Sequence, residues 1–163
     1  MGAPEHWDTP WLRDRVVETS LAWIGTPVIV LPAEPRLAAV RHAVLGWKPS
    51  PEATRAVHDL VHLCDPRARI DVVIATDSEG DPAASNGDEV RRHLVRHGFE
   101  VVIHTVPLAG DSEAEAIHGF ALDARADLLA VGGFGHSRVR EVVLGGVTRE
   151  LVRTPALPVM FSH

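Results

Sequence analysis

Cysteine is scarce in this chain, since Cys64 is the single one among 163 residues. One cysteine allows no internal disulfide, so the cross-linked framework of many small secreted proteins is excluded. Positive charge is also in short supply, because 16 Lys and Arg residues face 22 Asp and Glu residues, a formal net charge of −6. Nucleic-acid-binding proteins usually carry a basic surface. We therefore predict a cytoplasmic protein that does not bind nucleic acid.

Long apolar runs are missing as well. No stretch approaches the roughly 18 apolar residues that a membrane-spanning helix needs. The first residues, MGAPEHWDTP, are polar and lack the apolar segment of a signal peptide. His6 stands where a myristoylation signal requires Ser or Thr. These features predict no association with a membrane.

Several motifs with known chemistry do not occur. The sequence contains no Gly-x4-Gly-Lys-[Ser/Thr], which excludes the usual P-loop, and Arg138 stands where the dinucleotide fingerprint needs its third glycine. Ser137 follows a histidine, but it is not part of a nucleophile elbow. Asp127 precedes its predicted strand, at the end remote from the glycines that follow that strand. We therefore assign no catalytic residue and predict that Cys64 is a core thiol.

Histidine is abundant, in contrast. Two pairs are spaced four residues apart, which places both imidazoles of a pair on one helical face: His58 with His62, and His93 with His97. This spacing can chelate zinc, but the sequence assigns no third ligand. We interpret the pairs as solvated helix faces and predict no metal site.

Strand-like and helix-like segments alternate along residues 38–163. The predicted strands are 40–47, 70–76, 99–106, 128–131 and 158–161, and the predicted helices are 51–64, 88–97, 111–126 and 147–153. Residues 128–131 are an uninterrupted apolar run, typical of a strand buried on both faces of a parallel sheet. The alternation predicts an α/β domain with an open parallel five-stranded sheet and helices on both faces.

Residues 1–37 form a separate N-terminal extension in this interpretation. A helix is predicted over 11–23, a short strand over 26–31 and a linker over 33–37. The strand segment TPVIVLP has the same character as LPVMFSH at the end of the chain. Because the last strand would be an apolar sheet edge that needs a partner, we expect residues 27–31 to pair with it. The pairing would form within the chain or be exchanged between subunits, giving a homodimer.

Glycines cluster after the predicted strand 128–131, in the pattern Gly132-x2-Gly135-x9-Gly145-Gly146. Glycine lets an oxyanion approach backbone N–H groups closely, and a helix N-terminus presents unpaired N–H donors. Side chains that would add charge-assisted contacts to phosphate lie between the glycines: His136, Arg138 and Arg140. The pattern indicates a phosphate site, and it also fits a tight turn followed by a helix start.

This pattern resembles that of the universal stress protein family, whose ATP-binding members carry Gly-x2-Gly-x9-Gly-[Ser/Thr] between the fourth strand and the last helix. Gly132, Gly135 and Gly145 match in register, and residues 135–163 are similar to the closing segment of that domain. The resemblance implies a strand order of 3-2-1-4-5 within residues 38–163. Since two such domains are often fused in tandem, it also implies that residues 1–37 are a vestige of a preceding domain and a linker.

The resemblance implies a ligand site as well, where the first and fourth strands diverge. Gly132, Gly135, Gly145 and Gly146 would hold the phosphates of an adenine nucleotide, ATP with magnesium, and Arg138 would assist. Two positions depart from the pattern of the ATP-binding members. Gly146 stands where they have Ser or Thr, with Thr148 as a nearby substitute hydroxyl. Lys48 stands where they have an acidic residue that contacts the nucleoside, and it would instead reach toward phosphate.

A hydroxyl that donates to a charged phosphate contributes about 1.5–3 kcal/mol, so these departures weaken binding without affecting the fold. The function implied by the resemblance is adenine-nucleotide binding in a stress response, by a protein that is not an efficient enzyme and at most a weak ATPase. The alternative is a dimeric interaction module of the same fold that binds no nucleotide.

Overall fold

The computed structural model describes residues 25–34, 39–76, 87–133 and 155–163, together with the isolated residues Val16, Thr19, Ser20 and Leu151. The predicted helices 11–23 and 147–153 lie outside the described residues except for those isolated positions. So do residues 77–86 and five of the predicted ligand residues: Gly135, Arg138, Gly145, Gly146 and Thr148.

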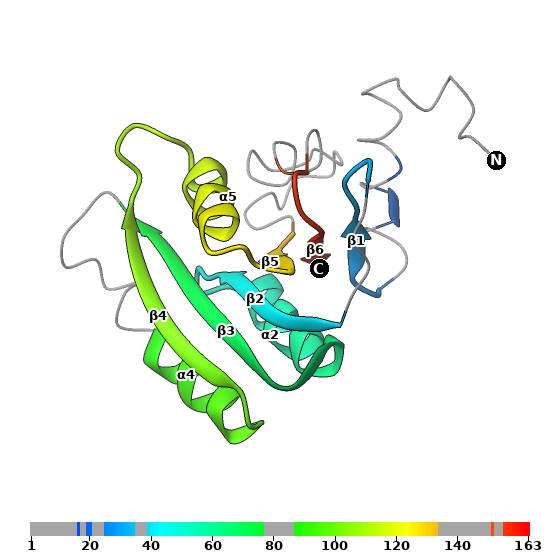
Figure 1. Ribbon diagram of the computed structural model, residues 1–163, viewed down its shortest axis with the longest axis vertical. Helices are drawn as coiled ribbons and strands as arrows, with labels where there is room; N and C mark the ends of the chain where they lie inside the picture. The colour runs from blue at the N-terminus through cyan, green and yellow to red at the C-terminus, as the bar shows by residue number, and fades with distance from the viewer. Residues whose placement is uncertain are drawn as a thin grey trace.

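Strands and helices alternate from residue 40 to residue 132 (Figure 1). In order, the described elements are β1 (Val28–Val30), β2 (Val40–Gly46), α2 (Pro51–Leu63), β3 (Cys64–Thr76), α4 (Gly87–Arg96), β4 (Glu100–Pro107), α5 (Glu113–Asp123), β5 (Leu128–Gly132) and β6 (Val159–Ser162). The predicted elements that fall within the described residues are therefore present, with ends that differ by a few residues.

The largest difference in bounds is at β3, which begins at Cys64 and not at residue 70. Asp65-Pro66-Arg67 has the composition of a turn, and Arg67 does adopt a positive φ of 68°. The strand nevertheless continues through it, because Cys64 pairs with Val40 and the register shifts before the pair His42 and Arg69. The irregularity is thus a bulge inside the ladder.

The sheet has six strands in the order β1-β6-β5-β2-β3-β4. Neighbouring strands from β2 to β6 run parallel, whereas β1 runs antiparallel to β6. The five strands predicted within residues 38–163 thus run parallel, and the additional antiparallel strand β1 makes the sheet six-stranded and mixed. The pairing expected between residues 27–31 and the last strand is present here within one chain, with Ile29 opposite Met160.

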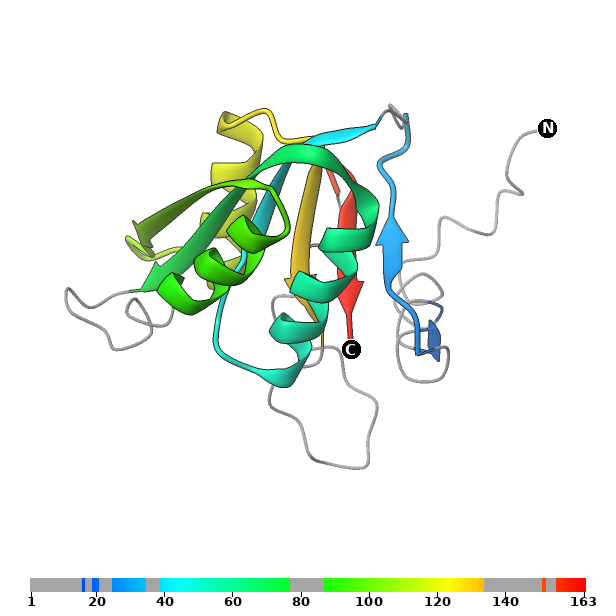
Figure 2. The same cartoon turned by 90° about the horizontal axis from the view of Figure 1, so that it is seen from below.

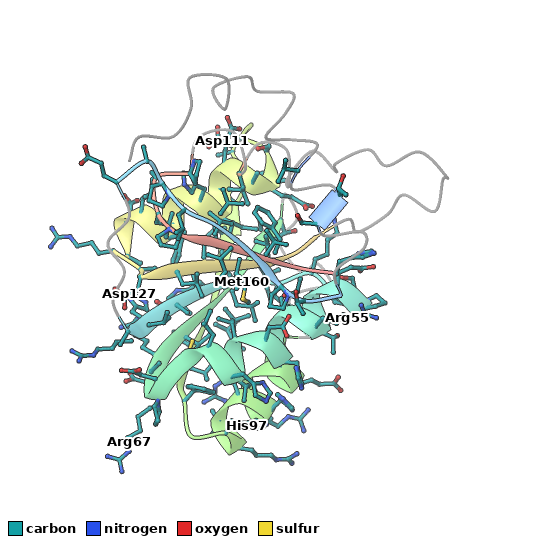
Figure 3. All side chains as sticks on the ribbon, turned by 90° about the vertical axis from the view of Figure 1, so that its right-hand side faces the viewer. Arg55, Arg67, His97, Asp111, Asp127 and Met160 are labelled. Atoms are coloured by element: carbon teal, nitrogen blue, oxygen red, sulfur yellow. The ribbon has the colours of Figure 1, made fainter. Side chains whose placement is uncertain are left out.

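Helices lie on both faces of the sheet (Figure 2). One apolar cluster joins α2, α4 and one sheet face and includes Leu45, Leu60, Ile70, Leu94 and Met160. Figure 3 shows Met160 in the interior between the sheet and α2. A second cluster lies between α5 and the opposite face and includes Val44, Val73, Ile117, Leu129 and Phe161. Alternate residues of β2, β5 and β6 therefore point into different clusters, as expected for strands buried on both faces.

Two of the crossover helices, α2 and α5, start at a hydroxyl cap. The Ser50 side chain accepts a hydrogen bond from Ala53 N at the start of α2, and Pro51 occupies the first turn. At α5, the Ser112 side chain accepts from Glu115 N while the Glu115 carboxylate accepts from Ser112 N, a capping box. These caps fix where the chain turns back after β2 and after β4, at the same edge of the sheet.

Candidate functional site

The winding of the sheet reverses between β2 and β5. From β2 the chain proceeds outward through β3 to β4, and α5 then returns it to β5 on the other side of β2. Gly46 at the end of β2 pairs with Val131 near the end of β5. In open α/β sheets ligands bind outside the carboxyl ends of strands at such a reversal. The structure thus brings Lys48 and Gly132 to the same edge of the sheet, following β2 and ending β5 respectively.

Gly132 is a glycine because α2 crosses it closely. A Cβ added there would lie 2.6 Å from Ala53 N and 2.9 Å from the Glu52 carbonyl carbon, both backbone atoms of the first turn of α2. Backbone atoms of a capped helix turn cannot move aside as a side chain would. The sequence interpretation placed phosphate against Gly132, but the described neighbours already account for the glycine by packing.

Trp47, Gly132 and Ser162 form one row across three neighbouring strands. Gly132 pairs with Ser162, and Trp47 follows Gly46, whose partner Val131 precedes Gly132. Trp47 packs against the cluster beneath α2 and α4, so this row continues the apolar row of Leu45, Ala130 and Met160. This row is the last one on the face of the sheet that α2 covers, at the carboxyl ends of the strands.

This row contains polar atoms without partners. Trp47 Nε1 and Ser162 Oγ are buried, and in the described part of the chain neither has a hydrogen-bond partner. Ser162 is 0% exposed. A buried donor or hydroxyl left without a partner costs about 1–3 kcal/mol. Such atoms at the edge of a reversed sheet indicate a place where a ligand or a bound water completes the hydrogen bonding.

Lys48 is held by α5. Its Nζ lies 2.7 Å from Glu113 Oε1, in the first turn of that helix. Both side chains are partly accessible to solvent, with exposed fractions of 59% for Lys48 and 36% for Glu113. An accessible pair of this kind contributes little to stability. Glu113 lies in a distant segment of the chain, which is why the sequence interpretation missed it as the partner of Lys48.

A second polar group lies further back, on the face of the sheet that α5 covers. Asp71 is 0% exposed, and its carboxylate contacts three side chains from three strands. His42 Nε2 lies 2.7 Å from Oδ2, His104 Nε2 lies 3.1 Å from Oδ1, and Arg69 Nη2 donates to Oδ1 at 3.0 Å. His104 also lies against Phe120 of α5, with ring centroids 4.7 Å apart.

Burial by itself raises the pKa of the Asp71 carboxyl. Hydrogen bonds from His42, Arg69 and His104, together with the charge of Arg69, outweigh it and hold that pKa below its usual value. Sequence analysis missed this group. The signal was a single aspartate inside the apolar run Ile70–Ala75, because a charge there requires partners on neighbouring strands.

The remaining sequence predictions concern residues outside the site. Asp127 lies at the beginning of β5, where Oδ2 accepts hydrogen bonds from Arg41 N and His42 N at 2.9 Å. Figure 3 shows Asp127 and Arg55 at opposite ends of the sheet. Cys64 is a buried free thiol, as predicted. Burial, and the charges of Asp65 and Asp127, raise its pKa to about 11, so the reactive thiolate is disfavoured.

The paired histidines do lie side by side. The ring centroids are 4.5 Å apart for His58 and His62 and 4.8 Å apart for His93 and His97. Asp59 lies beside the first pair, and its Oδ1 approaches His58 Nδ1 to 3.6 Å. Within the described ranges there is no group of three potential metal ligands, and no helix has the length and apolar composition to cross a membrane.

Comparison with known proteins places these features in context. Residues 28–163 match the model of the universal stress protein family. Universal stress protein Slr1230 of Synechocystis sp. is 32% identical over 89 residues, which are 55% of this chain and 30% of the relative. The chain thus matches less than a third of that relative's length.

Solved structures share the fold at lower identity. A universal stress protein from Archaeoglobus fulgidus DSM 4304 has a TM-score of 0.70 and 18% identity, over 90% of this chain and 54% of that one. A universal stress protein in complex with cAMP has a TM-score of 0.63 and 22% identity, over 77% of this chain and 98% of that one. At such identities the likeness concerns the fold.

Proposed function

Because this chain belongs to the universal stress protein family, we propose that it binds an adenine nucleotide, with ATP and magnesium as the first candidate, where β2 and β5 end. The observation that carries the proposal is the reversal of winding at this edge, where β2 and β5 end side by side. A structural neighbour in complex with cAMP supports an adenine nucleotide as the ligand class. The role is binding in a stress response in the cytoplasm, without efficient catalysis.

The phosphates in this proposal are held by the residues that follow Gly132, namely Gly135, Gly145, Gly146, Thr148 and Arg138. Gly132 itself contributes by allowing α2 to approach, since the backbone of Glu52 and Ala53 fills the space that a Cβ at this position would occupy. Gly132 therefore fixes the point at which the chain leaves β5. The unpartnered Ser162 Oγ and Trp47 Nε1 lie in the same row and leave hydrogen-bonding capacity at this edge.

Lys48 supplies a cation for the phosphates. It occupies the position from which ATP-binding members reach the nucleoside with a carboxylate, and it is paired with Glu113 at 2.7 Å. Because the pair is accessible to water, exchanging Glu113 for a phosphate oxygen costs little. Magnesium fits as an ion carried by the nucleotide, since it usually keeps several waters and binds through substrate phosphates.

Calorimetric titration with ATP and magnesium, and separately with AMP and cAMP, tests the proposal. The sharpest variant is Gly146→Ser, which restores the hydroxyl of the ATP-binding pattern. One hydrogen bond to a charged group contributes about 1.5 kcal/mol or more, so the dissociation constant for ATP should fall about tenfold. Gly146→Ala is the matched control, because it adds the same Cβ without the hydroxyl.

If Gly146→Ala tightened binding as much as Gly146→Ser, a hydroxyl contact to phosphate would be ruled out. Absence of heat and of a thermal shift at millimolar ATP in all three proteins would contradict nucleotide binding itself. That result would favour the alternative, an interaction module of the same fold. The packing of Gly132 against α2 and the Lys48–Glu113 pair favour this alternative, because both account for their residues without a ligand.

A homodimer that forms at the β6 edge is compatible with either function, nucleotide binding or the interaction module. The edge strand β1, which lies beside β6, is apolar, and Ile29 within it and Leu31 after it remain 40% and 39% exposed. An exposed apolar sheet edge is a place for pairing with another chain. Sedimentation of the purified protein over a range of concentrations tests this assembly.

A further inference from the structure

Strand β1 is similar in sequence to β6 and pairs with it antiparallel. Pro27-Val28-Ile29-Val30 corresponds to Pro158-Val159-Met160-Phe161, an apolar strand preceded by proline in each case. In the ladder, Val28 is opposite Phe161, Ile29 is opposite Met160, and Val30 is opposite Val159. Exchanging each β1 residue for its β6 counterpart leaves this set of pairs unchanged. The register is therefore the one that a two-fold axis through the pair Ile29 and Met160 would produce.

The side chains obey the same relation. Val28 and Val30 pack against the cluster that contains Val159 and Phe161. Ile29 points to the other face, as Met160 does, because directly opposite residues of an antiparallel pair share a face. On the side that faces β6, β1 therefore places apolar side chains at the positions that the β6 strand of a second copy would occupy.

One difference separates β1 from β6. Met160 is 0% exposed beneath α2, whereas its counterpart Ile29 is 40% exposed. A second copy would bring its own α2 over its own Met160, so β6 paired with β6 would leave no such residue uncovered. Pairing with β1 is the less buried of the two arrangements. It gains instead from being intramolecular: residues 31–39 join β1 to β2, and a short linker of this kind gives an effective concentration of about a millimolar.

We propose that β1 is a built-in competitor for dimerisation: it occupies, within the chain, the edge of β6 at which a second copy of this chain would pair. This inference rests on the proposed homodimer at the β6 edge. Pairing of β6 with β6 would follow the same two-fold, with Met160 opposite Met160 of the second copy and Val159 opposite its Phe161. The dimer forms only when β1 is released from both chains.

The competition should change the apparent dissociation constant of the dimer by a measurable amount. The apparent affinity of a protein whose competent state is only partly populated falls by the competent fraction, and here the fraction enters once for each chain. If β1 is docked about nine-tenths of the time, the apparent dissociation constant of the dimer rises about a hundredfold. Releasing β1 should therefore tighten the dimer far more than any surface change.

The test is the double variant Val28→Asp with Val30→Asp, in the full chain, analysed by sedimentation equilibrium. Carboxylates at these positions cannot stay in the apolar cluster, so β1 leaves while β6 is unchanged. The dissociation constant of the dimer should fall at least about tenfold relative to the unaltered chain. Ile29→Asp is the matched control, because it puts the same charge on the same strand at an exposed position and should change that constant much less.

A second variant, with the opposite expected effect on dimerisation, keeps the test valid if the charged variant misfolds. Ile29→Cys with Met160→Cys joins directly opposite residues, and the resulting disulfide locks β1 in place. The locked chain should stay monomeric at concentrations where the unaltered chain associates, and reduction should restore association.

The possible results separate the two proposals. Equal dissociation constants for the unaltered, charged and locked chains would overturn the competitor role and leave the homodimer standing. A monomer in every case, at the highest soluble concentration, would overturn both. In the charged variant, backbone amides of Val159 to Phe161 should exchange more slowly as protein concentration rises. Concentration-independent exchange in a dimeric variant would place the interface elsewhere and contradict the inference.

Discussion

Two clusters of polar side chains on this sheet differ in whether their hydrogen-bonding atoms have partners. Around Asp71, in the middle of the sheet, both carboxylate oxygens have partners among His42, Arg69 and His104. At the carboxyl edge, Trp47 Nε1 and Ser162 Oγ are buried without a partner in the described part of the chain. Polar groups that satisfy one another belong to the fold, whereas groups left without partners mark where another molecule fits. The first region should govern stability and the second should govern binding.

The largest effect on stability should follow Asp71→Ala. This substitution removes the common acceptor of three side chains and leaves Arg69 and the two imidazoles facing one another on a largely apolar sheet. We expect a loss of about 2–4 kcal/mol in the free energy of unfolding, measured by urea denaturation. Asp65→Ala is the control, because its contact with Arg41 is long, 3.6 Å, and both side chains are exposed. A loss below that of the control would show that the Asp71 group is not structural.

Gly132→Ala should be next, with a loss of about 1–3 kcal/mol in the absence of any ligand. The added Cβ would meet backbone atoms of α2 at 2.6 Å and 2.9 Å. Gly46→Ala is the comparison, because its Cβ would meet only side-chain atoms, of Val131 at 3.0 Å and Ile117 at 3.2 Å. Thermal denaturation of both variants tests the order. If Gly132→Ala were as stable as the unaltered chain, the close approach of α2 would not explain this glycine.

Acid should weaken the central group by a smaller amount. The folded-state pKa of Asp71 is lowered, so its contribution to stability is full above the unfolded pKa of about 3.9 and is lost as pH falls through the folded pKa. Asp71→Asn has no carboxyl to protonate. Its free energy of unfolding should therefore fall less steeply than that of the unaltered chain below about pH 4, in parallel denaturation series. Identical slopes would contradict the lowered pKa.

The smallest effect on stability should come from the edge. Lys48→Met breaks the accessible contact with Glu113 and should change the free energy of unfolding by less than about 1 kcal/mol. If the edge serves a nucleotide, the same variant should bind ATP at least several-fold more weakly in calorimetric titration. Glu113→Gln should bind ATP at least as tightly as the unaltered chain, because it frees Lys48. Loss of stability without loss of binding in Lys48→Met would reverse the proposed division between the two regions.

Prediction from the sequence worked best where a local pattern has one physical solution. The apolar run after Asp127 gave the buried strand β5, and the helical spacing of apolar residues within 51–64 gave α2, because such periodicity acts over a few residues. It worked less well where distant segments meet. The antiparallel direction of β1, the bulge in β3, the Glu113 partner of Lys48 and the carboxylate shared by His42 and His104 depend on which strands are neighbours.

The order of residues alone thus determined an alternating α/β chain, its family and the glycines at the edge of the sheet. Apolar periodicity and glycine spacing are properties of short segments and can be read without the fold. Only the folded arrangement decided which of these residues serve packing. It placed the backbone of α2 against Gly132, gave Lys48 a carboxylate from α5, and set β1 against β6 in a two-fold register. The physical reason is that burial and hydrogen bonding depend on neighbours in space, and the sheet brings together residues that lie far apart in the chain.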